Sequence, residues 1–558
     1  MKKLISASLL FMSATLMQAQ DPNTTIKLNS PKGEETPEFQ VRFSSVSDVK
    51  FNATNFGVFG YGIMEGNSGL EWPRNSGNTY GSAGGFWFGA MKLYHDANGI
   101  PAADKYCTAS YDPSNGNFCF TPGKIKDDIE MSADKYKLYC SAYFNAADGT
   151  SNSGSSTTPW PNWITNADNP LEFGAKQNTN VNDISKRTNA NYPLGPSFVS
   201  DEDFISVYHD TTLSRYTMGE DAARQKGYPM QLQVEERVYS WAKEELKDMV
   251  VLHYTVENKS NDTLAQCFFA PVYDIDLVND EDNTGASNDR VRYYKESPEL
   301  NLAVGWTMTN KGEAGKGFGY IGLTLLETPA INDTSYIRKD KTIYPQSEQI
   351  GLFSFRAWNS DQDIKNDEDM YYFISDDKGD DEGWRESDKG PGDKRMLMSV
   401  GPFTMLPGDK ARFAIGLVFA MPAKLAEADG TTADIAGANP NDESLVKKVR
   451  ALHKEYYKAS TTGVSDESNS SIIINAVYPN PTAKDISVDY SVEQDADVRI
   501  SIIDQFGTEM QVLYSGVRNA GKHTEQLQLD TDAISSGVYY LQVKIGNETK
   551  TKAISIVK

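Results

Sequence analysis

The chain has 558 residues, which corresponds to roughly three or four domain-sized units, and 39% of its residues are hydrophobic. That share supports folded cores and argues against wholesale disorder. The formal net charge of -23 argues against a nucleic-acid partner, because phosphate binding requires clustered Lys and Arg. Aromatic residues make up 11% of the chain and favour strands, since their rings suit a half-buried pleated surface.

The first 19 residues have the pattern of a secretory signal peptide. Lys2 and Lys3 form a basic start, residues 4–17 are mainly apolar, and the small Ala19 suits cleavage. A membrane anchor is the alternative, but the run is shorter than the ~20 apolar residues that span a bilayer. No later stretch is long enough either, so we expect export and no transmembrane segment in the mature protein.

The next segments differ in composition. Residues 20–50 are polar and punctuated by proline, which predicts an extended lead-in to a β-rich body over 51–458. Aromatic and glycine residues alternate over 56–62 and 84–90, which is typical of short, tightly turned strands. Residues 145–200 are rich in Asn, Ser, Gly and Thr and indicate a long loop, with a possible break there between two subdomains.

Alternating side chains predict strands in the rest of the body. Apolar residues recur at every second position in two stretches: Met230, Leu232 and Val234, and Phe413, Ile415, Leu417 and Phe419. A period of two is typical of strands with one buried face. The βα alternation of a parallel sheet is missing, so we expect a mainly β fold with an antiparallel, sandwich-like body.

One helix is expected before the end of the body. Leu445, Val449, Leu452 and Tyr456 recur at helical spacing. Residues 459–471 are rich in Ser, Thr, Asp and Asn and predict a linker. Residues 472–558 then form a separate small β-sandwich in this interpretation.

The terminal segment carries an ordered set of motifs. It opens with Tyr478-Pro479-Asn480-Pro481, continues through Gly507, and closes with Gly537 and Tyr539 ahead of a final apolar strand. This pattern resembles the type A C-terminal sorting domain of the Bacteroidota type IX secretion system. The resemblance implies export across the outer membrane to the cell surface or beyond.

The same resemblance implies partners. These are the outer-membrane translocon and a sortase-like peptidase that removes the tail, with attachment of the body to anionic lipopolysaccharide as a further step. The residues that match the family are recognition or folding positions: Tyr478, Pro479, Asn480, Pro481, Gly507, Gly537 and Tyr539. The body is more loosely similar to large secreted Bacteroidota proteins with the same tail, through Gly69-Leu70-Glu71-Trp72-Pro73 and Tyr273-Asp274-Ile275-Asp276. That similarity implies no chemistry.

An acidic stretch after a predicted strand suggests a calcium site. The candidate ligands are Asp274, Asp276, Asp280, Asp282 and Asp289. Crowded oxygen ligands on a turn suit Ca²⁺. An EF-hand is rejected, because Val291 stands where the bidentate Glu would be. The alternative is a hydrated loop that keeps the surface soluble.

A second acidic region covers residues 361–382 and is expected to be a solvated loop. Paired carboxylates there or elsewhere would allow a glycosidase mechanism. The five histidines are scattered, and no H-E-x-x-H pair, G-x-S-x-G elbow, phosphate loop or dinucleotide fingerprint occurs. The sequence therefore predicts no particular catalytic residue.

Trp160 and Trp163 are the best candidates for stacking on sugar rings, because loop composition surrounds them. Trp72 and Trp87 lie among glycines and aromatics, and we expect them in the core.

The chain has four cysteines, and export permits disulfides. Four cysteines allow three pairings, and Cys107 with Cys119 is the first expectation because the pair closes a short loop. A zinc site is the alternative, although no C-x-x-C pair exists.

Two functions follow from these observations. The first is an extracellular binding or structural module for glycan or matrix, with calcium-stabilised loops. The second is a secreted polysaccharide hydrolase that uses paired carboxylates. A deep cleft with two facing carboxylates would favour the hydrolase, and a shallow face would favour the module.

Overall fold

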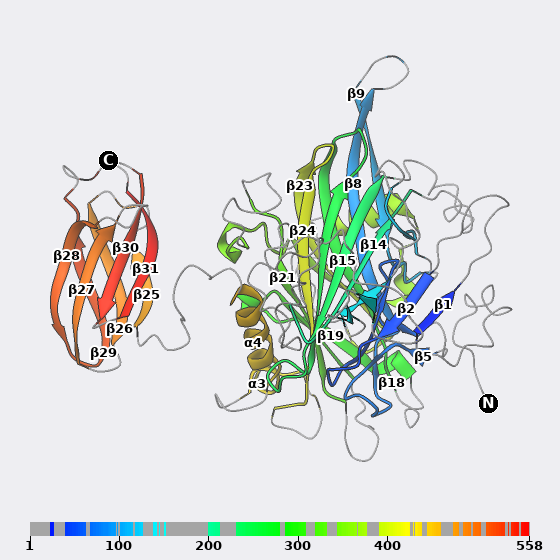
Figure 1. Ribbon diagram of the computed structural model, residues 1–558, viewed down its shortest axis with the longest axis horizontal. Coiled ribbons are helices and arrows are strands. Elements are labelled where there is room, and N and C mark those ends of the chain that lie inside the picture. Colours follow the sequence, from blue (N-terminus) through cyan, green and yellow to red (C-terminus); the bar gives the residue numbers. More distant parts are fainter. Residues whose placement is uncertain are drawn as a thin grey trace. The chain divides into compact units, whose positions relative to one another are not determined.

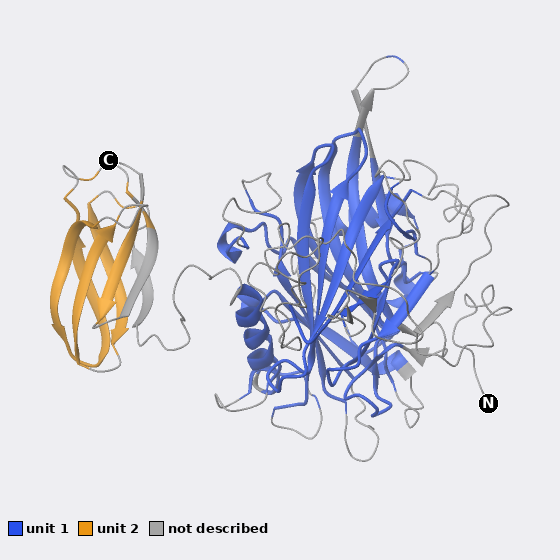
Figure 2. Ribbon diagram, viewed as in Figure 1, with its two compact units in different colours: residues 1–461 blue, residues 462–558 orange. Residues whose placement is uncertain are grey.

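The structure consists of two compact units, residues 1–461 and residues 462–558 (Figure 2). It is a computed structural model, and the residues that it describes are 23–26, 39–62, 67–95, 98, 101–114, 118–125, 138–141, 144–145, 150–151, 199–211, 230–278, 285–307, 318–331, 343–364, 366–375, 390–423, 428, 430–437, 444–458, 472–478, 482, 484–492, 495–503, 509–530, 534, 537–545 and 548–556. The predicted linker, residues 459–471, lies outside these ranges, as does the predicted signal peptide.

The larger unit is built on two antiparallel sheets (Figure 1). The nine-stranded sheet has the order β10 (Thr121–Pro122), β14 (Glu202–His209), β15 (Leu232–Ser240), β16 (Met249–Asn258), β24 (Lys410–Ala420), β21 (Tyr320–Glu327), β20 (Leu302–Thr307) and β19 (Asp289–Tyr293), and β11 (Tyr139–Cys140) also pairs with β14. The five-stranded sheet has the order β22 (Ser354–Asn359), β23 (Lys394–Met405), β17 (Leu264–Ile275), β8 (Ala83–His95) and β9 (Pro101–Ala109).

The two sheets pack face to face around one hydrophobic core. The rings of Phe269 on β17 and Phe413 on β24 stack across the interface with their centroids 4.1 Å apart. Alternation along β24 places Phe413, Ile415, Leu417 and Phe419 in this core. This confirms the predicted antiparallel sandwich. Full burial of each of these side chains stabilises the folded state by about 1.5–3 kcal/mol.

Helix α4 (Leu445–Lys458) covers the outer face of the nine-stranded sheet at β21 and β24. Its predicted apolar stripe is buried, and Oγ of Ser444 accepts the N–H of Lys447 at 3.2 Å, which caps the first turn. The helix can pack closely against the sheet because Gly416 on β24 lies beneath it. A Cβ atom at this position would lie 2.5 Å from Cδ2 of Leu452, which is too close. The predicted helix before the linker is confirmed, and the short α3 (Thr432–Ala436) also contacts it.

Helix α2 (Asp367–Ser375) covers the outer face of the five-stranded sheet, in a region where the sequence predicted a solvated acidic loop. Its three acidic residues occupy the first turn, where the helix dipole favours negative charge. Met370, Tyr371 and Ile374 are spaced to bury one face against β8 and β17. The expectation of a loop was wrong for residues 367–375, because capping and this short apolar stripe outweigh the charge density.

Shorter strands complete the larger unit. A six-stranded sheet has the order β1 (Asn23–Ile26), β2 (Phe39–Phe43), β3 (Lys50–Thr54), β6 (Leu70–Glu71), β7 (Thr79–Tyr80) and β18 (Leu277–Val278), and two small hairpins pair β4 (Tyr61–Gly62) with β5 (Asn67–Ser68) and β12 (Phe144–Asn145) with β13 (Thr150–Ser151). Phe39 and Val41 are buried, so part of the predicted lead-in belongs to the core. Strands from before and after residues 145–200 share both large sheets, so the possible break there does not divide the unit.

The smaller unit is a separate β-sandwich with its own core. One sheet has the order β25 (Ile472–Tyr478), β26 (Asp485–Val492) and β29 (Gly521–Gln528), and the other has the order β28 (Glu509–Arg518), β27 (Ala496–Ile503), β30 (Gly537–Ile545) and β31 (Glu548–Ile556). Inward-facing residues of both sheets, such as Val488 and Ile500, form one cluster. This confirms the predicted small terminal sandwich.

Candidate functional site

Three carboxylates meet where β17 ends and β23 begins. Asp274 lies at the end of β17, Asp276 follows the strand, and Asp393 precedes β23. Antiparallel pairing of the two strands puts Asp274 opposite Arg395, so the end of one lies beside the start of the other. One carboxylate oxygen from each aspartate lies within 4.8 Å of the others. We call Asp274, Asp276 and Asp393 the acidic cluster.

The acidic cluster is held by a guanidinium and a phenol. Nη1 of Arg395 lies 2.8 Å from Oδ1 of Asp274 and also pairs with Asp393. The Tyr111 hydroxyl donates to Oδ2 of Asp274 at 3.0 Å. Burial and the charge of Asp276 hold the pKa of Asp274 well above its usual value, and burial with the charge of Asp393 raises the pKa of Asp276 to about 6. Asp274 and Asp276 therefore hold a proton more readily than an exposed aspartate does, even with Arg395 beside them.

Asp289 lies against the same cluster. Its backbone carbonyl accepts the N–H of Gly392 at 3.0 Å, and its Oδ2 accepts the N–H of Leu277 at 3.0 Å. The side chain is fully buried, and its Oδ1 finds no hydrogen-bond partner among the described residues. Burial, together with the charges of Asp276 and Asp393, raises the pKa of Asp289 well above its usual value. A buried carboxylate oxygen without a partner is costly unless a cation or proton satisfies it.

The structure thus brings two of the five predicted metal ligands, Asp274 and Asp276, into the acidic cluster, and Asp289 lies beside it. Asp280 and Asp282 lie outside the described residues. The sequence did not predict Asp393 as a ligand, because Asp393 approaches Asp274 only through the register of two strands that lie far apart in the chain. Its place in a Gly-Pro-Gly-Asp turn just before a strand is the only local sign of it. Hard oxygen ligands at this spacing fit Ca²⁺.

A pocket of about 640 Å³ lies at the start of α2. It is lined by Arg356, Asp363, Ile364, Asn366, Asp369, Tyr372 and Phe373. Oδ1 of Asp363 accepts the Trp358 indole N–H at 2.7 Å and lies 3.3 Å from Nε of Arg395, so Arg395 links the pocket wall to the acidic cluster. The pocket is a shallow hollow that is open to solvent.

Asn366 and Asp369, which also line the pocket, form the cap of α2. Oδ1 of Asn366 accepts the backbone N–H of Asp369 at 2.9 Å, and Nδ2 of Asn366 donates to the Asp369 carboxylate at 2.6 Å. This reciprocal pair fixes both side chains at the rim. The pocket was not predicted, because it depends on α2, where the sequence predicted a solvated loop.

The predicted stacking residues, Trp160 and Trp163, lie outside the described residues. Trp72 and Trp87 are buried, as expected. Trp306 and Trp358 are also buried, so neither presents a ring face to a sugar. Among the large exposed hydrophobic side chains of the described body, the aromatic one is Tyr372, which lines the pocket and is 44% exposed.

The predicted bridge between Cys107 and Cys119 is not formed in the structure. Both residues are buried as thiols, as are Cys140 and Cys267. Cys107 on β9 faces the cluster beneath α2, whereas Cys119 enters the core between the two large sheets. A disulfide requires Cβ atoms about 3.5–4.5 Å apart, which side chains in separate clusters do not provide.

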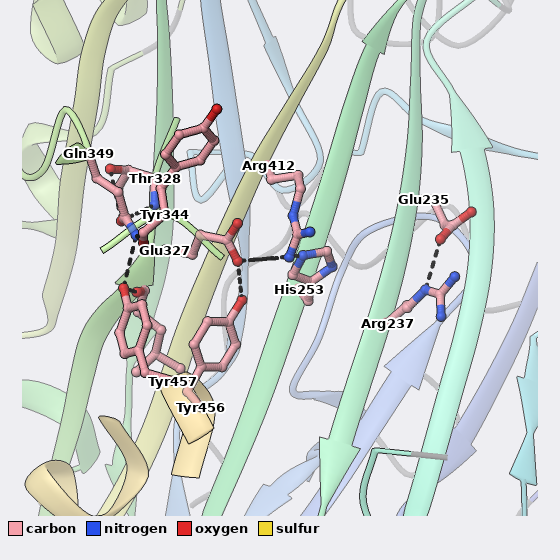
Figure 3. A network of polar contacts seen from close by, with 11 residues as sticks. Glu235, Arg237, His253, Glu327, Thr328, Tyr344, Gln349, Arg412, Tyr456 and Tyr457 are labelled. Atoms are coloured by element: carbon pink, nitrogen blue, oxygen red, sulfur yellow. Dashed lines mark hydrogen bonds and ion pairs between the residues drawn. The ribbon is translucent and has the colours of Figure 1, made fainter. Parts of the chain in front are cut away.

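A buried polar network lies between the nine-stranded sheet and α4 (Figure 3). Glu327 on β21 is its centre: Oε2 lies 2.9 Å from Nη2 of Arg412 and accepts the Tyr456 hydroxyl. The Tyr457 hydroxyl, one residue on, donates to the carbonyl of Leu326 and accepts from Nε2 of Gln349 at 3.0 Å. The network anchors the last turn of α4 to the sheet.

His253 faces this network but has no catalytic access. It is 2% exposed, and its Nε2 lies 3.9 Å from Oε2 of Glu327. Burial, with Arg412 and Arg237 nearby, lowers the pKa of His253 well below its usual value. The imidazole is therefore neutral at pH 7 and is part of the core.

The sorting residues are partly described. Tyr478 ends β25, Gly537 begins β30, and Tyr539 packs half-buried against the tail core. Pro479, Asn480, Pro481 and Gly507 lie outside the described residues.

Comparison with known proteins identifies the tail. A family described as the secretion system C-terminal sorting domain matches residues 476–557. The smaller unit is thus a sorting domain of the type IX pathway. The chain is a cargo of the type IX secretion system, exported to the cell surface or released outside the cell. The sorting domain implies contact with the secretion machinery and its sortase-like peptidase.

Two further comparisons concern whole proteins. No curated protein matches the chain. Solved structures that align with it include a polysaccharide lyase (8% identity, TM-score 0.17, 58% of this chain and 34% of that one) and a Faecalibacterium prausnitzii β-glucuronidase (8%, 0.12, 51% and 46%). A third is dimeric latent PorU from Porphyromonas gingivalis (8%, 0.13, 64% and 31%). The chain spans less than half of each, and TM-scores this low support no shared fold or activity. No helix in the described ranges is long and apolar enough to cross a membrane.

Proposed function

We propose that the body, residues 20–461, is an extracellular binding or structural module that recognises a glycan or matrix component. The observation that carries this proposal is the pocket beside α2, where guanidinium, carboxylate and amide groups surround an exposed aromatic ring. Sugars combine apolar ring faces with directional hydroxyls, so they match such a mixture. Export by the sorting domain places the module where such ligands occur.

The alternative is a polysaccharide hydrolase in which Asp363 and Asp369 are the paired carboxylates. Burial raises the pKa of Asp363, as a general acid requires. However, Asp363 is engaged by Trp358 and Arg395, and Asp369 is engaged in the cap of α2. Both carboxylates have structural partners, which favours binding over hydrolysis.

A combined glycan-array and hydrolysis screen tests this proposal on a chain of residues 20–558. Binding without release of reducing ends supports the module. Release of reducing ends that is abolished in Asp363→Asn and Asp369→Asn supports the hydrolase. A protein that neither binds nor cleaves any glycan or matrix component contradicts the proposal.

Calcium binding is part of the same proposal. Asp274, Asp276 and Asp393 supply oxygen ligands, and the buried, unpartnered Oδ1 of Asp289 supports a cation nearby. Asp280 and Asp282 remain predicted ligands from the loop that follows. The ion would neutralise crowded carboxylates and stabilise the loops between β17 and β19.

The delivery route completes the proposal. Residues 1–19 direct export to the periplasm, the type A tail is presented to the translocon, and a sortase-like peptidase removes it. The body is then attached to anionic lipopolysaccharide. Mass spectrometry of the surface-exposed form tests this route: we expect an N-terminus near residue 20 and a C-terminus within 459–471. A surface form that retains residues 472–558 would contradict it.

A further inference from the structure

Tyr372 is an exposed ring held in one orientation. Its side chain is 44% exposed, on the α2 side of the pocket. Nζ of Lys105, on β9, lies 3.9 Å from the ring centroid and also donates to the hydroxyl. A cation on the ring and a hydrogen bond to its hydroxyl restrict the side chain before any ligand arrives. Pre-organisation of this kind lowers the entropy cost of binding.

The pocket also has a fixed cationic donor. The guanidinium of Arg356, on β22, lies 5.0 Å from the centroid of Phe373, and the Arg356 side chain is largely buried. The Phe373 ring packs on Trp358 with the centroids 5.0 Å apart. Two aromatic rings in edge-to-face contact therefore support the guanidinium and restrict the direction in which it donates.

The acceptors opposite are fixed as well. Asp363 is held by Trp358 and Arg395, and Asn366 and Asp369 hold each other. The pocket has charges of both signs: Arg356 lies with Asp363 and Asp369 in the lining, and Lys105 and Arg395 add cations beside it. The whole chain carries -23. This overall negative charge disfavours uronate or sulfated sugars, which would be repelled at low salt.

We propose that this pocket binds a neutral pyranose unit of a glycan chain, which rests on the proposed function and names its ligand class. The apolar face of the sugar stacks on Tyr372. Its hydroxyls donate to Asp363 and Asp369 and accept from Arg356. The combination of a rigid ring and a balanced set of donors and acceptors defines the site.

Calorimetric titration with purified residues 20–558 tests this assignment. The probes are cellohexaose, xylohexaose, mannohexaose and laminarihexaose, with oligogalacturonate as the acidic comparison. We expect at least one neutral hexaose to bind and oligogalacturonate to bind at least tenfold more weakly. Tyr372→Ala should weaken binding at least tenfold, and Tyr372→Phe, which keeps the ring but loses the hydrogen bond from Lys105, should weaken it less than Tyr372→Ala.

Leu406→Ala is the matched control, since Leu406 is a similarly exposed apolar residue on a turn outside the pocket lining. Circular dichroism verifies that each variant is folded. Native affinity of Tyr372→Ala for a neutral hexaose overturns the pocket assignment but leaves the proposed function intact, as does a preference for oligogalacturonate. A native protein that binds none of these and no other glycan or matrix component overturns both.

Discussion

Asp276→Asn separates two effects expected at a cation site: repulsion between its carboxylates, and their stabilisation by the bound ion. In the native protein, carboxylate oxygens of Asp274, Asp276 and Asp393 lie within 4.8 Å of one another. Two ionised carboxylates at that separation repel by about 3 kcal/mol at an effective dielectric constant near 20, and Arg395 offsets part of this. The amide removes one charge and keeps an oxygen acceptor. In EDTA we therefore expect the variant to be at least as stable as the native protein.

Calcium should reverse that order. Extracellular calcium sites have dissociation constants of about 10⁻⁴–10⁻³ M, so 10 mM calcium should stabilise the native protein by about 1.4–2.7 kcal/mol. The variant loses a charged ligand and should gain less than half of this. Relative to the native protein, Asp276→Asn should therefore be at least as stable in EDTA and less stable in calcium.

Urea unfolding followed by tryptophan fluorescence measures both effects, with EDTA and 10 mM calcium in parallel. Glu244→Gln is the control, because the Glu244 side chain is 82% exposed and belongs to no carboxylate cluster in the described structure. Its calcium response should equal that of the native protein. The reasoning is refuted if calcium stabilises Asp276→Asn as much as the native protein, or stabilises neither.

Two further predictions concern the core. Burial raises the pKa of Glu236 from 4.5 to about 8. Between these two pH values the native state holds a proton that the unfolded state has lost, so the free energy of unfolding falls as pH rises through this window. Glu236→Gln should reduce the pH dependence of the free energy of unfolding by up to about 1.4 kcal/mol per pH unit. Urea unfolding from pH 5 to 8 measures this dependence, and an unchanged slope would contradict the raised pKa. Leu452→Ala should lower the free energy of unfolding by about 2–5 kcal/mol, because Leu452 is fully buried on the sheet-facing side of α4. A loss below 1 kcal/mol in thermal unfolding would argue that α4 is not docked.

Much of the fold could be predicted because its pattern is local. The alternation at Phe413, Ile415, Leu417 and Phe419 defines one buried face of a strand, and the spacing of Leu445, Val449 and Leu452 defines a helical stripe. These patterns depend only on backbone geometry and burial, so they can be read without knowledge of neighbours. The terminal sandwich was predictable for the same reason and through its motifs.

The candidate sites were less predictable because they depend on tertiary pairing. Asp393 joins Asp274 only through the register of β17 and β23. The pocket exists because α2 forms in an acidic stretch, where the Asn366–Asp369 cap outweighs charge repulsion. The side chains of Cys107 and Cys119 diverge into different clusters, although the residues are near in sequence. Each of these features depends on contacts between segments that sequence proximity does not reveal.

The central claim is that the two units have separate tasks: residues 462–558 export the chain, and the body alone binds. Expression of residues 1–461 and of the full chain in a bacterium that has the type IX system tests this directly, by fractionation and by glycan binding of the recovered body. We predict that the truncated body stays in the periplasm and binds with native affinity. Normal amounts of the truncated body at the surface or in the medium, or a retained body that folds but does not bind, would contradict the account.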